Sequence, residues 1–149
     1  MDSELKELLE RHEGRKRFPY HCTAGKLTVG VGHNIDAKGL PNYIQDYLDR
    51  NGFIKDEMID ELLEQDVQDA INDCEKLYPF FLTFSDVRQY ALIDFLFNVG
   101  LGTARQFKNT NKAINAEKWE EAAEGFEKSL WYKQVKNRAV EIVKMIREG

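Results

Sequence analysis

Residues 13–33 read EGRKRFPYHCTAGKLTVGVGH, and this stretch decides the interpretation of the fold because it holds the only convincing β-structure in the chain. Residues 27–31 alternate between apolar and other side chains, as in a strand. The segment before them is a predicted turn, since small and flexible residues follow one another there, at Thr23, Ala24 and Gly25. The sequence therefore predicts one small hairpin.

Helices are predicted on both sides of this hairpin. Residues 3–12 place three leucines on one face, and Gly14 suits the left-handed residue just beyond a helix end. Residues 56–78 read as a long amphipathic helix that Pro79 ends. Residues 86–99 are nearly apolar all round, which predicts a buried central helix. Shorter helices are expected over residues 110–115, 118–129 and 137–147.

Length and composition indicate a single domain. The chain has 149 residues, of which 42% are apolar and 32% charged, so collagen-like and disordered classes are excluded. We expect a mainly helical α+β fold with two lobes. A small hairpin lobe spans residues 14–55, and a helical lobe spans residues 79–149 and includes the N-terminal helix. The helix of residues 56–78 joins them, and a cleft between two such lobes suits a polymer substrate.

Charge and cysteine content exclude several classes of partner. The net charge of −5 argues against non-specific binding of nucleic acid, and residues 41–78 are the acidic part, with 11 acidic and 3 basic side chains. No apolar stretch approaches the ~20 residues of a membrane span, and no signal peptide is recognised. The two cysteines cannot form a disulfide framework. We expect a monomer without cofactor or metal.

Spacing within the quoted stretch is the strongest signal. Glu13 is followed nine residues later by Cys22 and, six beyond that, by Thr28, in a Thr-x-Gly-x-Gly-His hairpin that ends at His33. This pattern resembles the phage-type (T-even-like) lysozymes, which have Glu, eight residues, Asp or Cys, five residues and Thr. The resemblance continues through residues 64–67, 97–100, 129–132 and 137–139, nearly the whole chain. It implies hydrolysis of the β-1,4 bond between N-acetylmuramic acid and N-acetylglucosamine in bacterial peptidoglycan.

Three residues carry the expected chemistry. A glycosidic bond breaks when an acid protonates the leaving oxygen while a second group handles water, and Glu13 is the candidate acid. Taken alone, Glu13 is more typical of a surface carboxylate at a helix end, and the full motif is what favours catalysis. Cys22 stands where the family most often has Asp, so it either acts as the base or merely lines the cleft. The hydroxyl of Thr28 suits holding the attacking water, although a β-branched residue is also typical of a strand. The phage type implies inversion at the anomeric carbon.

Further site residues follow from the resemblance. Arg138 is expected to orient Glu13, and Phe97 and Asn98 to bind substrate, with Phe97 as a core residue in the alternative. Gly32 and the nearby Gly30 leave one strand face without side chains, so that a sugar or the neighbouring lobe approaches the backbone. A tight hairpin alone would also use these glycines.

Several conspicuous residues are expected to be structural. Asp66 lies on the apolar stripe of the long helix, where an unpaired carboxylate would be costly. The resemblance supplies His33 as its partner, which implies an ion pair between hairpin and helix. Cys74 is expected to be a buried free thiol. The aromatic residues of the C-terminal helices are expected to be packing anchors: Trp119, Trp131 and Tyr132.

Two other functions stay open, and the resemblance implies a biological setting. A lytic transglycosylase needs one acid and no separate water-handling group, and an inactive cell-wall-binding module needs neither. The resemblance implies lysis of a host cell by a phage or prophage. Synthesis in the host cytoplasm would then precede action on the cell wall in the periplasm, with export through a holin-type pore.

Overall fold

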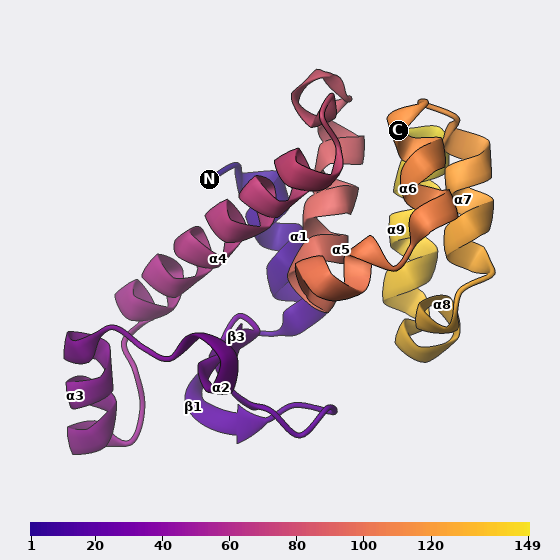
Figure 1. The fold of residues 1–149 in the computed structure, drawn as a ribbon. Helices are drawn as coiled ribbons and strands as arrows, with labels where there is room; N and C mark the ends of the chain where they lie inside the picture. Colours follow the sequence, from indigo (N-terminus) through magenta and orange to yellow (C-terminus); the bar gives the residue numbers. More distant parts are fainter. The chain divides into compact units, whose positions relative to one another are not determined.

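The computed structural model describes residues 1–149 as nine α-helices, one 3₁₀ helix and one three-stranded sheet (Figure 1). The mainly helical α+β class predicted from sequence is confirmed. The chain divides into two compact units, Met1–Asp66 and Val67–Gly149, and the boundary falls inside the long helix α4 (Asp56–Leu77). The lobe boundaries expected at residues 14–55 and 79–149 stay a prediction.

Helix α1 (Ser3–Glu13) opens the first unit and ends on the candidate acid. Asp2 caps its start, because the side chain accepts a hydrogen bond from the backbone N–H of Glu4 at 2.8 Å. Gly14 ends it at a φ of 79°, where a glycine avoids the strain of a side chain, and donates its N–H to the carbonyl of Glu10. The predicted helix is thus confirmed and extends one residue further, to Glu13.

The sheet consists of β1 (Lys16–His21), β2 (Leu27–Gly30) and β3 (His33–Asn34), antiparallel and in that order. Tyr20 faces Thr28 across the first pair, and the register shifts between Lys16 and Tyr20, where Pro19 cannot donate a ladder hydrogen bond. The turn closes with two hydrogen bonds, from the N–H of Cys22 to Lys26 at 3.0 Å and from the N–H of Gly25 to Cys22 at 2.8 Å. The predicted hairpin is confirmed, and β3 adds a third short strand.

Two helices of the first unit have no counterpart in the sequence prediction. The single turn α2 (Ile35–Lys38) is capped by the side chain of Asn34 and has no buried residue. Helix α3 (Asn42–Asn51) buries only Ile44. Because neither helix buries an apolar stripe, the periodicity that identifies helices in sequence is too weak in both.

Helix α4 follows the predicted long helix closely and ends at Leu77, one residue before the expected end. Its apolar stripe is buried along most of its length: Ile59, Leu62, Leu63, Val67, Ala70 and Cys74. Asp66 is buried on the same stripe. The solvent-facing side carries the acidic residues, as is typical of a charged helix face.

The second unit continues with the 3₁₀ helix η1 (Phe81–Thr83) and α5 (Asp86–Arg105). Gly100, at a φ of 80°, interrupts α5 just after the predicted end at residue 99, and the helix resumes beyond it. The shorter helices are α6 (Lys108–Asn115), α7 (Trp119–Glu127), α8 (Leu130–Val135) and α9 (Asn137–Glu148). Three match predicted helices, whereas α8 was not predicted, because its six residues are too few to show a period.

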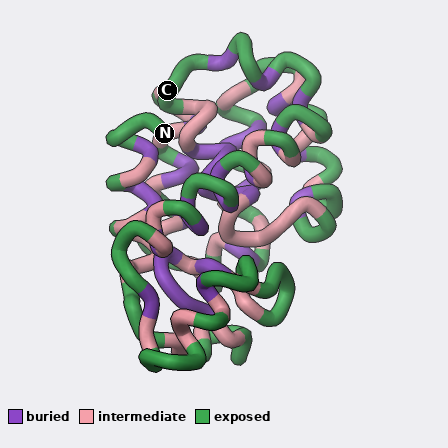
Figure 2. Tube along the Cα trace, turned by 90° about the vertical axis from the view of Figure 1, so that its left-hand side faces the viewer, coloured by how far each residue is buried: buried purple, intermediate pink, exposed green.

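Four aromatic side chains form the centre of the second unit. Phe95 makes T-shaped contacts with the other three at centroid distances of 4.9 to 5.0 Å: Phe107, Phe126 and Trp131. Helix α9 packs against α5, α7 and α8, and α6 packs against α7. Figure 1 shows α6 to α9 grouped together in orange and yellow. Trp131 is thus a core residue, as predicted. Figure 2 shows that buried residues recur at intervals along the trace.

Candidate active site

The carboxyl group of Glu13 lies against the backbone of Gly32. A Cβ atom at position 32 would come within 2.8 Å of Glu13 Cδ and 2.9 Å of Oε1, closer than real Cβ contacts. Gly32 also has a φ of +64°. Glycine is therefore required here twice, by the backbone conformation and by the carboxyl group that fills the space of a side chain.

The space beside these two glycines is filled by the protein itself, at Gly30 in β2 and at Gly32 in the turn between β2 and β3. A Cβ at Gly30 would lie 3.2 Å from a methyl carbon of Ile59 in α4, while Gly32 receives the end of Glu13. The close approach expected from these glycines exists, and within the first unit its occupants are an isoleucine and the candidate acid. Substrate binding by Gly32 stays a prediction.

Cys22 and Thr28 lie at the turn of the hairpin. Thr28 is buried and donates its hydroxyl hydrogen to the carbonyl of Lys26 at 2.8 Å. The pKa of the Cys22 thiol lies below its ordinary value, chiefly because the backbone of Lys26 hydrogen-bonds the thiolate. Burial opposes this shift, while the backbone of Ala24 supports it. The turn thus favours a negatively charged sulfur, as a base requires.

The basic residues nearest to Cys22 in the chain are engaged elsewhere and are not the main cause of its lowered pKa. Arg15 binds acidic groups at α4, Lys16 lies over the Tyr20 ring at 4.8 Å, and Arg17 lies over the Phe53 ring at 4.8 Å. None of them appears among the causes of the lowered pKa of Cys22. Backbone hydrogen bonds of the turn supply the stabilisation in their place.

Tyr20 is a member of this site that sequence reasoning missed. Burial raises the pKa of its hydroxyl, and the negative charges of Glu13 and Cys22 raise it further. Tyr20 thus lies within electrostatic reach of both candidate catalytic groups. Its only signal in the sequence is its position two residues before Cys22, because Cys22 lies beyond the end of β1 at His21.

His33 and Asp66 are brought together in the first unit. The Nδ1 of His33 lies 2.7 Å from Oδ2 of Asp66, and its Nε2 lies 2.8 Å from the carbonyl oxygen of Gly39. Lys38 donates to the other carboxylate oxygen of Asp66 at 3.0 Å. Both ring nitrogens therefore face acceptors, an arrangement that suits the doubly protonated ring.

The pKa of His33 reflects this environment. Burial lowers it, but hydrogen bonds to Asp66 and Gly39 and the charge of Asp66 outweigh that effect, so the pKa lies above its ordinary value. The pair lies in the interior, with His33 5% and Asp66 5% exposed. The pair attaches the hairpin to α4. Both ring nitrogens of His33 are already hydrogen-bonded, so neither is available for catalysis.

Arg138 has a carboxylate partner in its own unit. Its Nε and Nη2 donate to Oδ1 of Asp94 at 2.8 and 2.6 Å, and Asp94 is fully buried. Sequence reasoning missed Asp94, although a single carboxylate inside an otherwise apolar helix requires a buried cation. Arg138 and Glu13 belong to different units, and the expected orienting role of Arg138 stays a prediction.

Asn98 and Phe97 lie half-buried on α5. The indole N–H of Trp131 donates to Oδ1 of Asn98 at 2.8 Å, which fixes the orientation of the amide. The Nδ2 group of Asn98 thereby keeps its hydrogens for another acceptor. Phe97 makes none of the aromatic contacts of the core cluster, so it is not one of its members.

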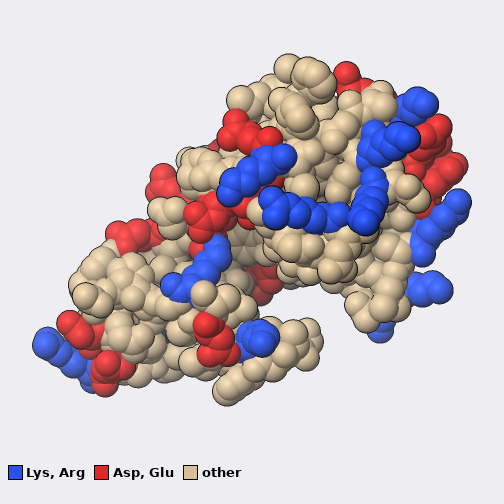
Figure 3. Space-filling view, viewed as in Figure 1, with Lys and Arg blue, Asp and Glu red and all other residues tan.

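No group of three or more His, Cys, Asp or Glu side chains is arranged to hold a metal ion. No helix has the length and apolar character needed to cross a membrane. Cys74 is buried and free, as predicted. On the face drawn in Figure 3, basic and acidic side chains lie side by side.

Comparison with known proteins gives a consistent result. The phage lysozyme family model matches residues 10–147. The chain is 26% identical to probable T4-type lysozyme 1 of Dictyostelium discoideum and 28% identical to probable T4-type lysozyme 2 of the same organism, each over 100% of this chain and 96% of the relative. It is 30% identical to the pre-baseplate central spike protein Gp5 of Enterobacteria phage T4, over 97% of this chain and 28% of that protein. The chain belongs to the phage lysozyme family.

Proposed function

We propose that this protein hydrolyses the β-1,4 bond between N-acetylmuramic acid and N-acetylglucosamine in bacterial peptidoglycan. The observation that carries the proposal is the Glu13 carboxyl group, held at the end of α1 against the hairpin that bears Cys22 and Thr28. Membership of a lysozyme family supplies the class of bond. Lysis of a host cell by a phage or prophage is the setting that we propose for this activity.

In the proposed reaction Glu13 is the general acid. It donates its proton to the glycosidic oxygen as the bond from that oxygen to the anomeric carbon breaks. A water molecule attacks the anomeric carbon from the opposite face, and the Cys22 thiolate accepts the proton that the water loses. The product sugar then has the inverted configuration. The lowered pKa of Cys22 supports this assignment, because the thiolate must be present at the working pH.

The other residues have supporting roles in this proposal. The Thr28 hydroxyl, whose hydrogen is engaged with Lys26, offers its lone pairs to the attacking water. Asn98 donates from its Nδ2 group to a carbonyl or hydroxyl oxygen of the substrate, and Phe97 and the Gly32 backbone line the binding site. Arg138 orients Glu13. No cofactor takes part.

The decisive experiment compares clearing of bacterial cell walls by the wild type, Glu13→Gln, Cys22→Ser and Cys22→Asp. We expect Glu13→Gln to abolish clearing, because the amide has no proton to give, and Cys22→Asp to retain it. Rapid clearing by Glu13→Gln would refute the proposal. Loss in Glu13→Gln alone, with full activity in Cys22→Ser, would confine the chemistry to one acid.

Product analysis distinguishes the main alternative. A hydrolase leaves a reducing N-acetylmuramic acid end, whereas a lytic transglycosylase, which needs a single acid and no base, leaves an anhydro sugar. A base at Cys22 would have a role only in the hydrolase. An inactive binding module would bind cell walls normally and release no sugar.

A further inference from the structure

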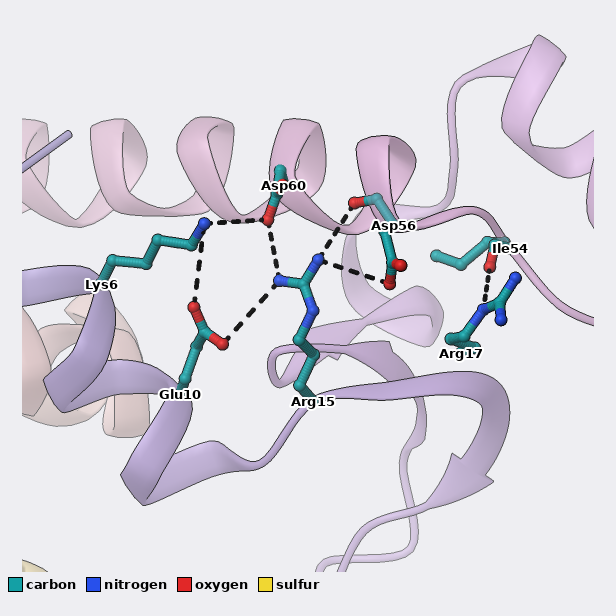
Figure 4. A network of polar contacts seen from close by, with 7 residues as sticks. All are labelled: Lys6, Glu10, Arg15, Arg17, Ile54, Asp56 and Asp60. Atoms are coloured by element: carbon teal, nitrogen blue, oxygen red, sulfur yellow. Dashed lines mark hydrogen bonds and ion pairs between the residues drawn. The ribbon is translucent and has the colours of Figure 1, made fainter. Parts of the chain in front are cut away.

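A network of charged side chains surrounds Arg15, two residues after the candidate acid (Figure 4). Its Nη1 donates to Oδ1 of Asp60 at 2.8 Å, and its Nη2 donates to the backbone oxygen of Asp56 at 3.2 Å. The same guanidinium lies 3.9 Å from a carboxylate oxygen of Glu10 and 3.6 Å from one of Asp56. Arg15 therefore contacts both the last turns of α1 and the first turn of α4.

The position of Arg15 in the chain makes these contacts significant for Glu13. Gly14 separates the two residues at a φ of 79° and donates its N–H to the carbonyl of Glu10, which closes the last turn of α1. Beyond this bond, the end of α1 is linked to α4 by side-chain contacts. Arg15 supplies them through a planar group with five donors, which can bind several acceptors at once.

The strand that follows, β1, is attached to Ile54, two residues before the start of α4. The N–H of Ile54 donates to the carbonyl of Arg17 at 3.0 Å, and the Nε of Arg17 donates to the carbonyl of Ile54 at 3.3 Å. Further along the hairpin, Gly30 packs against Ile59. The α1–β1 connection and β2 thus share one support, the start of α4.

Three contacts connect α1, α4 and the hairpin to one another near Glu13. Arg15 joins α1 to α4, Gly30 and Ile59 join α4 to the hairpin, and Glu13 and Gly32 join the hairpin to α1. If one contact is lost, the elements it joined shift relative to each other. Because the carboxyl group occupies the space where a Cβ of residue 32 would lie, a displacement of α1 moves it relative to the hairpin.

We propose that Arg15 is a positioning residue for the reaction, which holds the Glu13 carboxyl group in its catalytic place by fixing the end of α1 to Asp56 and Asp60. This inference rests on the function proposed above. It predicts an effect on turnover and not on substrate binding, because Arg15 faces the carboxylates of α1 and α4 and not the hairpin turn.

The test measures kcat and KM on soluble peptidoglycan fragments for Arg15→Ala, Arg15→Lys and Asp60→Asn. Lys6→Ala is the matched control, because Lys6 lies 3.3 Å from Asp60 and 3.9 Å from Glu10 but sits inside α1, away from the connection. We expect Arg15→Ala to lower kcat about tenfold with KM within about twofold, since sub-ångström misplacement of a reacting group costs one to two orders of magnitude. Asp60→Asn should lower kcat less, and Arg15→Lys should restore part of it. Lys6→Ala should leave kcat unchanged.

The double variant Arg15→Ala/Asp60→Asn should be no slower than Arg15→Ala alone, because both changes break one interaction. An Arg15→Ala variant with wild-type kcat, or a Lys6→Ala variant that is equally slow, would overturn the inference. Circular dichroism at the assay temperature ensures that each variant is folded. Glu13→Gln measured beside them separates the two proposals: if it stays active the proposed function fails, whereas an inactive Glu13→Gln beside a fully active Arg15→Ala refutes only the role of Arg15.

Discussion

Replacing Gly32 by alanine tests the placement of the candidate acid most directly. The new Cβ would lie 2.8 Å from Glu13 Cδ, whereas ordinary contact begins at 3.4 Å. One of the two groups must therefore move by about 0.6 Å, the difference between these distances. Because the carboxyl group is the far end of a flexible side chain, Glu13 moves and the turn between β2 and β3 does not.

The expected cost to stability is modest. An alanine at a φ of +64° costs about 1–2 kcal/mol, because its Cβ crowds the carbonyl oxygen in the left-handed region. For a chain of this length that corresponds to a fall in Tm of about 3–8 °C. A domain stabilised by about 5–15 kcal/mol remains folded at 25 °C after such a loss. Unfolding would therefore not account for a loss of activity.

The expected cost to catalysis is larger. A displacement of 1 Å can lower a rate by about 100-fold, so about 0.6 Å should lower kcat at least about tenfold. The assay is release of reducing ends from soluble peptidoglycan fragments at 25 °C, with Tm measured on the same samples. Gly52→Ala is the matched control, because Gly52 also has a positive φ, of +79°, but has open space where its side chain would lie.

Two outcomes would refute this reasoning. A Gly32→Ala enzyme with kcat within twofold of the wild type would mean that the contact with Glu13 does not position the acid. A Gly52→Ala enzyme as slow as Gly32→Ala would mean that backbone strain, and not the contact, lowers the rate.

Three further predictions concern the other ionisable groups. Because the folded-state pKa of His33 is raised, its pair with Asp66 stabilises fully below the unfolded-state pKa of about 6.5 and less as the pH rises through the folded-state value. Asp66→Asn should therefore lower Tm more at pH 6 than at pH 9, and an equal Tm for wild type and variant at both would reject the pairing as a stabilising contact. Cys22→Asp should shift the rise of kcat with pH to lower pH, because a carboxyl ionises well below a thiol, whereas Cys22→Ser should lose at least about 100-fold; identical pH profiles would exclude Cys22 as the base. Asp94→Asn should lower the free energy of unfolding by about 3 kcal/mol in urea titrations, because it removes the buried carboxylate that binds Arg138, and an unchanged unfolding midpoint would contradict that estimate.

The parts of the fold that the sequence predicts well are those with a strong period. Helix α4 and the first part of α5 bury long apolar stripes and were predicted to within about a turn. Helices α3 and α8 bury one residue each, Ile44 and Trp131, and left no comparable trace. Local capping by Asn34 and Ser129 forms the short helices, and such caps are too common in loops to predict a helix by themselves.

Candidate site residues were recognisable where they lie close together along the chain. Glu13 ends α1, Cys22 lies at the hairpin turn and Thr28 lies in β2, so fixed numbers of residues separate them within one short stretch and a one-dimensional pattern records them. Asp94 and Arg138 are 44 residues apart and meet only through packing of α5 against α9. Such a pair shows itself in sequence only as an isolated charge in an apolar helix, which indicates that a partner exists and does not identify it.

Gly32 shows what a sequence pattern leaves open even where it is recognised. Alternating glycines indicate an approach to the backbone, and the pattern is the same whether a sugar, another helix or a catalytic side chain makes it. The structure gives that space to the Glu13 carboxyl group. A substrate that also uses Gly32 must then bind through its peptide N–H or carbonyl group beside the carboxyl group, and not through the vacant side-chain position. The glycine would thereby set the distance between the sugar and the proton that cleaves it, so Gly32→Ala should change kcat and KM together if both roles hold, and kcat alone if only the contact with Glu13 does.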